Sequence, residues 1–246
     1  TVKATTIKEQ LMLFVNCVVV NPAFDSQTKD YLNTPISKFG SRCEVSDKFI
    51  DKLAKMGVMD AALSLNEVKQ LKYTIKKLQS LKKKIKEYEL IFIDDFSNDG
   101  SYQQLVLFKK KDSRIKIFKN IKKGLGSAIK VGIKKSKKKY VCIFMCDLSD
   151  DVNDIYKYYK AITDNKKLDA VFGTRFDKNS KVINYPFFKL MLNRIANNVI
   201  KILFLSNYND FTNAFKIYKK KVLLRLFPIV SENFNIFLEL PLKIIT

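Results

Sequence analysis

Hydrophobic residues follow two spacings that alternate along most of the chain. From Asn66, four apolar side chains three or four positions apart share one face of a predicted helix: Val68, Leu71, Ile75 and Leu78. Short apolar runs rich in β-branched residues then alternate with further stretches of helical spacing. The pattern predicts strands at 89–93, 114–118, 140–145 and 169–172, and helices at 100–108, 125–135 and 152–162. Such alternation is typical of an α/β fold, in which helices cover a mostly parallel sheet.

The first 65 residues show a different pattern. Residues 11–20 are apolar and β-branched, which predicts a buried strand, and a polar, turn-rich loop follows them. Ser46 then has the side chain of a helix N-cap, and Gly57 stands where a left-handed residue would end that helix. The apolar face of this helix consists of Phe49, Ile50, Leu53 and Met56. The pattern predicts a small α+β segment ahead of the larger α/β part.

The charge of the chain is as uneven as its hydrophobic pattern. Its 246 residues include 46 Lys and Arg and 24 Asp and Glu, a formal net charge of +22. Residues 1–65 hold eight basic and seven acidic residues, a net charge of +1, whereas residues 66–246 hold 38 and 17, a net charge of +21. The lysines lie at scattered helix ends and only five of the cations are Arg, which argues against a specific nucleic-acid partner. We expect a solvated lysine-rich surface, with attraction to an anionic membrane as the alternative.

The composition excludes several kinds of site. The chain has no His, so it has no Ser-His-Asp triad, no Cys-His pair and no histidine metal site. The spacing of Cys17, Cys43, Cys142 and Cys146 fits neither a zinc site nor a disulfide framework, and we expect buried free thiols in a reducing cytosol. No apolar run reaches the roughly 18–20 residues of a membrane span, and no signal peptide is recognisable. The expected location is cytoplasmic, with peripheral attachment to a membrane as a variant.

Acidic residues stand at the ends of two predicted strands. Two of them follow the first strand and three follow the strand at 140–145: Asp94, Asp95, Asp147, Asp150 and Asp151. Ligands of parallel α/β sheets bind beyond the carboxyl ends of the strands, and carboxylates there suit a divalent cation shared with substrate phosphates. The alternative is that these residues only cap the helices that follow.

From Asn66 onwards, seven sequence blocks resemble the family 2 glycosyltransferases in their order, and most closely the polyprenyl-phosphate (dolichyl-phosphate mannose synthase-like) branch. The blocks are LNEVKQLKYTIKKL, YELIFIDDFSNDGS, NIKKGLGSAIKVGIKKSKKKYVCIFMCDLSDD, DAVFGTRF, NYPFFKLMLNRIANNVI, DFTNAFKIYKK and ENFNIFLELPLK. The resemblance implies a GT-A fold over residues 66–246, incomplete at both ends. It also implies transfer of a sugar from a nucleoside diphosphate sugar.

The resemblance assigns the nucleotide to four residues. Asn66 and Glu67 stand where the family's first loop meets the nucleotide. Asp94 and Asp95 match the nucleotide-contacting pair at the end of the family's second strand. These assignments place the donor at the carboxyl edge of the predicted sheet.

The resemblance assigns the chemistry to a second group of residues. Asp147 matches the second acid of the family's Asp-x-Asp metal motif, and Ser149 is a further candidate ligand because Met145 replaces the first acid. Arg175 matches a block near the sugar and phosphates, and Lys216 belongs to a block that faces the acceptor phosphate. The implied cofactor is Mg²⁺ or Mn²⁺, which would stabilise the departing nucleoside diphosphate.

The implied reaction is a single in-line displacement at the anomeric carbon, with inversion. A polyprenyl-phosphate oxygen is already anionic, so no general base is needed and the lack of His is no obstacle. Residues 186–205 alternate apolar clusters with Lys189, Arg194 and Lys201, which fits a helix on a membrane surface near such an acceptor. A helix packed on the sheet is the alternative.

Residues 1–65 instead resemble the transducer region in the ATPase part of eukaryote-type type IIA DNA topoisomerases. The similarity is continuous over LMLFVNCVVVNPAFDSQTKDYLNTPISKFGSRCEVSDKFIDKLAKMGVMDAALS, and FDSQTK is its most specific piece. In that family a Gln-Thr-Lys loop reaches the ATP site, which implies counterparts in Gln27, Thr28 and Lys29. Because the sequence lacks the family's nucleotide-binding and cleavage domains, we expect neither ATP hydrolysis nor DNA cleavage.

The two resemblances meet at about residues 60–66, where the net charge also changes. The strand that opens a GT-A sheet is replaced there, which leaves three alternatives. Residues 58–65 form a substitute strand, residues 14–20 fill its place, or the sheet lacks it. Loss of that strand and of the first metal acid leads us to expect impaired catalysis. The alternative function is that of a non-catalytic fragment of a type IIA DNA topoisomerase.

Overall fold

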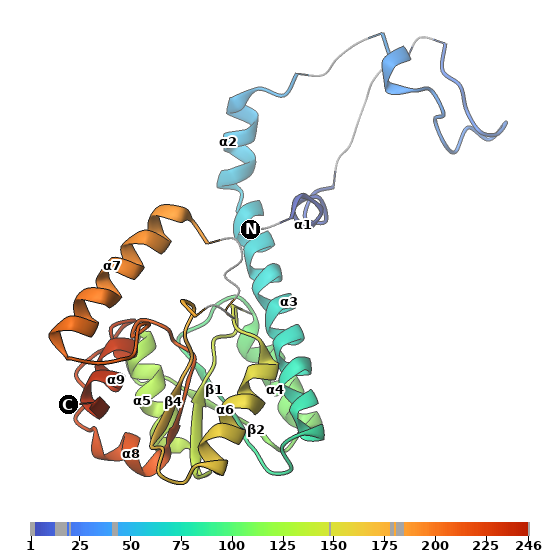
Figure 1. Cartoon of the computed structure of the whole chain (residues 1–246). Helices are drawn as coiled ribbons and strands as arrows, with labels where there is room; N and C mark the ends of the chain where they lie inside the picture. Colours follow the sequence, from blue (N-terminus) through green and yellow to red (C-terminus); the bar gives the residue numbers. More distant parts are fainter. Residues whose placement is uncertain are drawn as a thin grey trace. The chain divides into compact units, whose positions relative to one another are not determined.

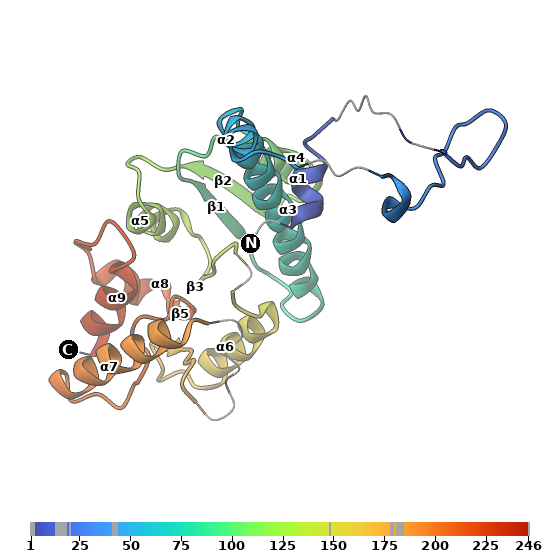
Figure 2. The same cartoon turned by 90° about the horizontal axis from the view of Figure 1, so that it is seen from above.

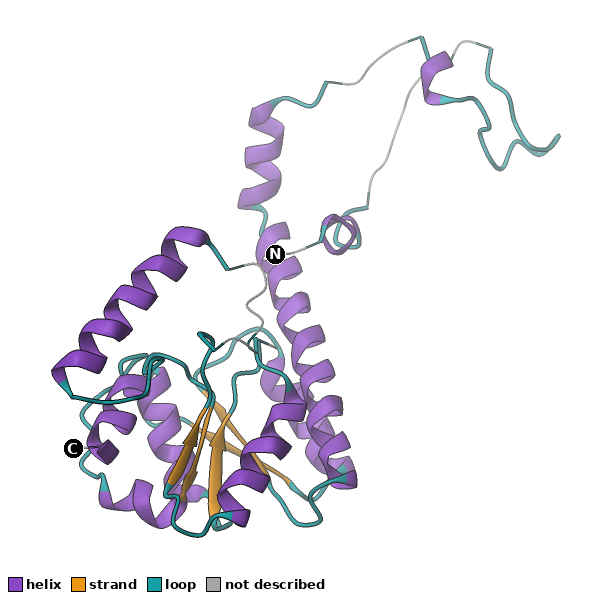
Figure 3. Ribbon diagram, viewed as in Figure 1, coloured by secondary structure: helices purple, strands orange, loops and turns teal. Residues whose placement is uncertain are grey.

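The computed structural model describes residues 3–12, 19, 21–40, 44–147, 149–177, 180 and 185–245. These residues belong to two compact units, Thr1–Asn66 and Glu67–Thr246. The division lies one residue from the boundary expected between 65 and 66. Figures 1 and 2 together label the helices and strands, and Figure 3 shows the secondary structure along the chain.

In the first unit, the helix predicted after Ser46 is confirmed. α2 spans Asp47–Lys55, and the Ser46 hydroxyl accepts a hydrogen bond from the Phe49 N–H at 3.3 Å. Gly57 has a left-handed φ of 82°, which lets the chain leave the helix without strain. The predicted apolar face is largely solvent-exposed, with Met56 exposed by 76%.

The rest of the first unit holds little regular structure among its described residues. α1 spans Ala4–Lys8, and a 3-10 helix spans Ile36–Lys38. A single antiparallel bridge joins Phe24 to Leu32. Residues 13–18 and 20 of the predicted strand lie outside the described residues, as does most of the alternative that places 14–20 in the sheet.

α3 spans Val58–Ser80 and begins before the predicted start at Asn66. Residues 58–65 are therefore helical, and the alternative that they form a substitute strand is wrong. Ala61 and Ala62 lie in this stretch, and Ala has the strongest helix propensity of all residues. The predicted buried face is confirmed, because Val68, Leu71, Ile75 and Leu78 are all in the core.

The second unit alternates strands and helices as its hydrophobic pattern predicts. After a 3-10 turn at Leu81–Lys83 come β1 (Leu90–Asp94), α4 (Ser101–Lys111), β2 (Ile115–Lys119), α5 (Leu125–Lys135), β3 (Tyr140–Ile143), α6 (Val152–Asp164) and β4 (Ala170–Phe172). Then follow α7 (Phe187–Leu203), β5 (Lys216–Lys219), α8 (Lys220–Arg225) and α9 (Ile236–Ile245). The predicted strands and helices are present, with bounds that differ by at most three residues.

The strands form two separate hydrogen-bonded sheets. β1 pairs with β2 in parallel, from Leu90 opposite Ile115 to Asp94 opposite Lys119. β5 lies between β3 and β4 and runs antiparallel to both. The α/β class is confirmed, but the pairing is mixed rather than mostly parallel because β5 enters between two strands of the same direction. Among the described strands, none pairs with the second edge of β1 or of β3.

Helices cover both faces of these strands (Figure 2). One core joins α3, α4 and α6 to β1 and β2, and Ile75, Leu105 and Ile155 are among its members. The other core joins α5, α8 and α9 to β5 through residues such as Ile133 and Leu240. This two-sided packing holds the loops after β1, β3 and β4, where the charged residues gather.

The structure also tests the burial of the cysteines and the presence of a membrane-spanning helix. The described cysteines are free thiols, but Cys142 is only partly buried and Cys146 is exposed, so the burial expected for Cys146 is wrong. Cys17 and Cys43 lie outside the described residues. Within the described ranges, no helix is both long and apolar enough to cross a bilayer.

Candidate functional site

The two acids at the end of β1 have different surroundings. Asp95 accepts hydrogen bonds from the Gly124 N–H at 3.0 and 3.1 Å and from Asn120 Nδ2 at 2.8 Å, so it holds the loop that leads into α5. Asp94 is 9% exposed, and its Oδ1 has no hydrogen-bond partner among the described residues. Buried carboxylate oxygens are normally paired, so Asp94 is the better candidate to receive a donor group of a nucleotide.

Glu67 lies near the same edge through its contact with Asp99. A hydrogen bond from Glu67 to Asp99, burial and the Asp99 charge raise the pKa of Glu67. Burial alone would raise the pKa of Asp99 as well, but hydrogen bonds from Ser101 Oγ at 2.7 Å and from its N–H at 2.9 Å lower it. Asp99 is therefore the more acidic of the two carboxyls. Asn66 precedes Glu67 in α3 and is partly buried.

The loop after β3 carries the predicted metal residues. Asp147 Oδ1 accepts a hydrogen bond from the Ser149 N–H at 3.0 Å, and both residues are exposed. Asp150 is partly buried, and burial together with the Asp147 charge raises its pKa to about 6. Within the described ranges, no group of three His, Cys, Asp or Glu side chains could hold a metal ion. The residues present fit only a cation that substrate phosphates help to bind.

Arg175 is fixed by a buried partner that sequence reasoning missed. Its Nε and Nη2 donate to the Asp210 carboxylate at 2.9 and 2.6 Å, and its backbone N–H donates to the same group at 2.8 Å. Asp210 is fully buried, whereas the Arg175 side chain is 28% exposed. The pair gives the site one oriented cation at the surface. Asp210 begins the sequence block DFTNAFK, which is the only sequence signal that pointed to it.

Gly173, at the end of β4, is closely packed against Tyr158 and the backbone of Phe215. A Cβ atom at this position would lie 1.9 Å from Tyr158 Oη and 3.3 Å from the Phe215 carbonyl oxygen. The Gly173 carbonyl accepts hydrogen bonds from Tyr208 Oη at 2.6 Å and from Asn213 Nδ2 at 3.0 Å. These contacts set the path of the backbone that leads from β4 to Arg175.

Lys216, which was expected to face an acceptor phosphate, is buried in this structure. It is fully buried in β5, and its Nζ donates to the carbonyl oxygens of Phe211, Asn213 and Phe237. Burial lowers the pKa of Lys216 to about 7. The structure therefore shows this ammonium group in a structural role, and its contact with an acceptor phosphate stays a prediction.

The predicted ATP-contacting loop of the first unit is an exposed turn. Gln27, Thr28 and Lys29 are all exposed, and the Lys29 N–H donates to the Ser26 carbonyl at 3.1 Å. The Lys29 ammonium lies 5.7 Å from the centre of the Phe24 ring. These contacts describe a solvated loop lysine.

Comparison with known protein families decides the class of the chain. The profile of glycosyl transferase family 2 matches residues 63–227, which cover β1 to α8. The chain belongs to glycosyl transferase family 2. The candidate site residues of the second unit and Asn66, which together run from Asn66 to Lys216, all lie inside the matched region.

The first part of the chain is similar to a different family. The DNA gyrase B profile matches residues 1–88, so the two matches overlap at 63–88. DNA topoisomerase 2 of Arabidopsis thaliana is 49% identical over 71 residues, which is 29% of this chain and 5% of that protein. DNA topoisomerase 2 of Bombyx mori is 36% identical over 85 residues, which is 35% of this chain and 6% of that protein. The chain thus spans about one-twentieth of the length of these curated relatives.

Proposed function

We propose that this glycosyltransferase moves a sugar, with inversion, from a nucleoside diphosphate sugar to a polyprenyl phosphate at a membrane surface. The family supports the sugar transfer, and one feature supports the lipid acceptor. That feature is the outward apolar face of α7, the first helix after the Arg175 block.

α7 is built with its polar side toward the protein. Asn197 is fully buried, and its Nδ2 donates to the Asn193 carbonyl at 2.8 Å and to Thr212 Oγ1 at 3.2 Å. The opposite side is exposed and apolar, and it continues two residues past the helix: Phe187, Phe188, Met191, Leu192, Ile195, Val199, Ile202, Leu203, Phe204 and Leu205. A patch of this kind marks a surface that binds a partner or a membrane.

The charges of α7 favour a lipid surface as that partner. The helix carries Lys189, Arg194 and Lys201 and has no acidic residue. Helices that lie in a bilayer interface combine an apolar face with cations in this way. Each cation near an anionic leaflet contributes roughly 1 kcal/mol of attraction. A polyprenyl phosphate presents both parts of this chemistry, an apolar chain and an anionic head.

The reaction assigns a distinct role to each part of the site. Asp94 and Glu67 bind the nucleotide, and Arg175 supplies a fixed positive charge to the phosphates. Asp147 and Asp150 would hold Mg²⁺ or Mn²⁺ together with the diphosphate, and the metal would stabilise charge on the leaving group. The acceptor phosphate oxygen attacks as an anion, so no side chain has to remove a proton.

Vesicle binding tests the acceptor side of this proposal. We expect the chain to co-sediment with vesicles of phosphatidylcholine and phosphatidylglycerol, and Phe188→Ser combined with Leu192→Ser to reduce the bound fraction at least tenfold. Ile121→Ser is the matched control, because Ile121 is 86% exposed but lies in the loop after β2. Equal binding by the double variant and the wild type would remove α7 from the proposal.

Sugar transfer is tested separately with the purified chain, a panel of nucleoside diphosphate sugars and a short polyprenyl phosphate. The expected result is an Mg²⁺- or Mn²⁺-dependent glycolipid that forms slowly, because residues 58–65 are helical rather than a first strand and Met145 replaces the first metal acid. Arg175→Ala should abolish its formation. The second candidate, a non-catalytic topoisomerase fragment, rests on the match of residues 1–88. Thermal shift distinguishes the two, because a nucleotide sugar at 100 times its Kd stabilises a true donor site by about 2.7 kcal/mol. No shift with any nucleotide sugar, and no transfer, would favour the fragment.

A further inference from the structure

The loop after β1 carries an exposed aromatic ring on a strained backbone. Phe96 has a left-handed φ of 62° and is 58% exposed. A bulky residue rarely adopts this conformation, whereas glycine adopts it without steric cost. The exposed ring contributes little to the core, so packing does not explain why a phenylalanine stands here. Strain of this kind is concentrated at ligand sites, where the surrounding structure imposes it.

Hydrogen bonds on both sides of the ring impose this backbone conformation. The Asp94 carbonyl accepts a hydrogen bond from the Asn120 N–H at 2.8 Å. Asn120 Nδ2 donates to the Asp95 carboxylate, also at 2.8 Å. At the other end of the loop, the Asp99 carboxylate accepts from the Ser101 N–H at 2.9 Å and from Ser101 Oγ at 2.7 Å. The loop is therefore fixed at both ends, and the ring between them is held in place.

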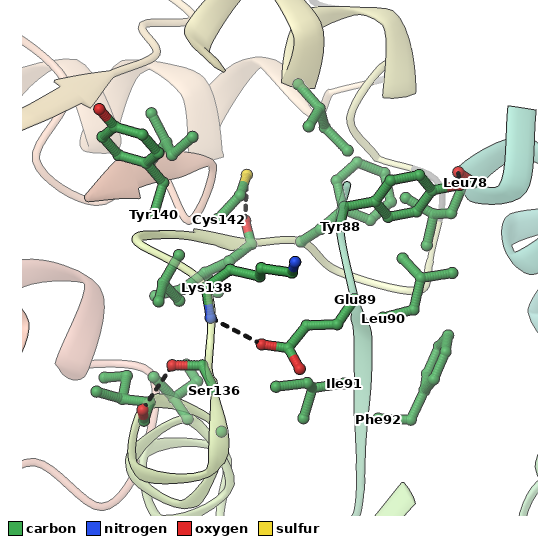
Figure 4. Close-up of a pocket in the computed structure, with 18 of the residues that line it drawn as sticks. Leu78, Tyr88, Glu89, Leu90, Ile91, Phe92, Ser136, Lys138, Tyr140 and Cys142 are labelled. Carbon is green, nitrogen blue, oxygen red and sulfur yellow. Dashed lines mark hydrogen bonds between the residues drawn. The ribbon is translucent and has the colours of Figure 1, made fainter. Parts of the chain in front are cut away.

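Asp94 directs its carboxylate to the α3 side of β1. Side chains of a strand alternate between its two faces, and Figure 4 shows Leu90 and Phe92 on one side of β1 and Ile91 on the other. Leu90 and Phe92 belong to the core that includes α3 and α4, and Asp94 continues their side of the alternation. Asp94 is 9% exposed, and its Oδ1 has no hydrogen-bond partner among the described residues. A carboxylate oxygen only accepts, so it needs a donor group from a ligand.

The ring and the carboxylate are close enough to contact one small ligand. Two residues of extended chain span at most about 7 Å between their Cα atoms, which limits the separation of Asp94 and Phe96. A ligand that satisfies both has an N–H at its edge and a flat aromatic face. A nucleobase has both features, whereas a phosphate group has neither. Aromatic side chains stack on bases with little preference for one base, because every base has a π-face.

The charge of the loop argues against a membrane as the partner of the ring. The segment DDFSNDGS, residues 94–101, holds three acidic residues and no cation. α7, in contrast, has cations and no acidic residue. An anionic leaflet attracts cations and repels carboxylates, so this loop is the less suitable of the two for a lipid surface. The observations therefore favour a nucleobase.

We propose that Phe96 stacks on the nucleobase of the sugar donor, while Asp94 accepts a hydrogen bond from an N–H at the edge of the same base. This inference rests on the proposed transfer from a nucleoside diphosphate sugar and adds the residue that holds the base. The ring contributes to donor affinity and takes no part in the displacement. Its contact is with the base alone, so it does not affect binding of the diphosphate.

Tryptophan fluorescence tests the stacking directly, because the chain contains no Trp. Phe96→Trp places a single indole at the proposed contact. We expect its fluorescence to be quenched by at least one of UDP, GDP, ADP and CDP with Mg²⁺, and to be unchanged by pyrophosphate, which has no base. Phe234→Trp is the matched control, since Phe234 is 68% exposed and lies just before α9. Its fluorescence should not respond to nucleotides.

Calorimetric titration measures how much the ring contributes. Phe96→Gly removes the ring and suits the left-handed backbone. We expect it to weaken binding of the best nucleoside diphosphate about tenfold and to leave pyrophosphate affinity unchanged. Phe96→Trp should bind the nucleotide at least as well as the wild type, because it keeps an aromatic face.

Four results would overturn the proposal, and they are distinguishable. Equal nucleotide affinity in the wild type and Phe96→Gly would exclude stacking but leave the donor site intact. Equal losses of nucleotide and pyrophosphate affinity would assign the ring a structural role. A response of Phe96→Trp to vesicles of phosphatidylcholine and phosphatidylglycerol, but not to nucleotides, would assign it to a membrane. No binding of any nucleotide or of pyrophosphate by the wild type would overturn the proposed sugar transfer together with this inference.

Discussion

Replacement of Asp210 tests whether the buried ion pair holds the site together. The Asp210 carboxylate is fully buried and accepts three hydrogen bonds from Arg175, two from the guanidinium and one from the backbone. Asp210→Ala leaves all three donors without this acceptor. Breaking a buried pair costs about 3–5 kcal/mol, and the partial exposure of Arg175 places the cost near the lower limit, about 3 kcal/mol. For a chain of this size, that corresponds to a fall in Tm of roughly 6–12 °C.

Urea unfolding followed by far-UV circular dichroism measures this cost, because urea leaves the ion pair unscreened. Glu87→Ala is the control: Glu87 pairs with Lys138, but both side chains are exposed, so no measurable change is expected. A double variant, Asp210→Leu with Arg175→Met, removes both charges and should regain much of the lost stability. The reasoning is refuted if Asp210→Ala costs less than about 1 kcal/mol, or if the double variant is less stable than the single one.

Three further predictions concern packing and protonation. Gly126→Ala should lower stability by about 1–3 kcal/mol in urea unfolding, because the new Cβ would lie 2.5 Å from the Ser231 carbonyl oxygen. Gly132→Ala on the same helix meets only Ile93 at 3.7 Å and should raise stability by up to about 1 kcal/mol; the reverse order would contradict this packing. Burial lowers the pKa of Lys216 to about 7, so between pH 7 and its ordinary value near 10.5 the unfolded chain binds the extra proton, and stability should rise with pH. Lys216→Met should lose that rise, measured by unfolding at pH 6.5, 8 and 9.5, and an unchanged slope would assign it to other groups. Burial alone would raise the pKa of Glu239, but Lys243, Ser231 and Val230 outweigh it and hold the pKa at about 2. Its stabilisation should fade as pH falls from about 4.5 to 2, and Glu239→Gln should show a flatter acid limb.

Local patterns predicted the elements well where apolar spacing and capping agree. α5 has the predicted bounds, and α2 begins at its Ser46 cap, because both signals act within a few residues. β5 was missed because two of its four residues are lysines, which are rarely buried. In the fold, Lys216 finds backbone carbonyl oxygens and Lys219 pairs with Asp169 at 3.0 Å. Such partners come from distant parts of the chain, so the sequence does not display them.

In the candidate site, too, the sequence predicted the residues but not their contacts. The acids after β1 and β3 were expected from their positions at strand ends, yet their surroundings differ in ways that the motif does not reveal. Asp95 is engaged with Gly124, whereas Asp94 keeps an unpaired oxygen. The partner of Arg175 lies 35 residues away along the chain, and only the folded backbone brings Asp210 beneath it. A pair so far apart in the sequence forms only when the whole second unit has folded, because the chain between the two residues includes α7.

The exposed apolar side of α7 also affects how the purified chain behaves in solution without a membrane. Its outward Phe, Leu and Ile side chains attract one another between molecules, while a net charge of +22 keeps the molecules apart. The range of that repulsion is about 10 Å at 0.1 M salt and about 3 Å at 1 M. Colloidal stability should therefore decrease as salt is added, the opposite of the response of a protein whose contacts are mainly ionic. Detergent or lipid, rather than ionic strength, is the variable that keeps α7 covered during purification.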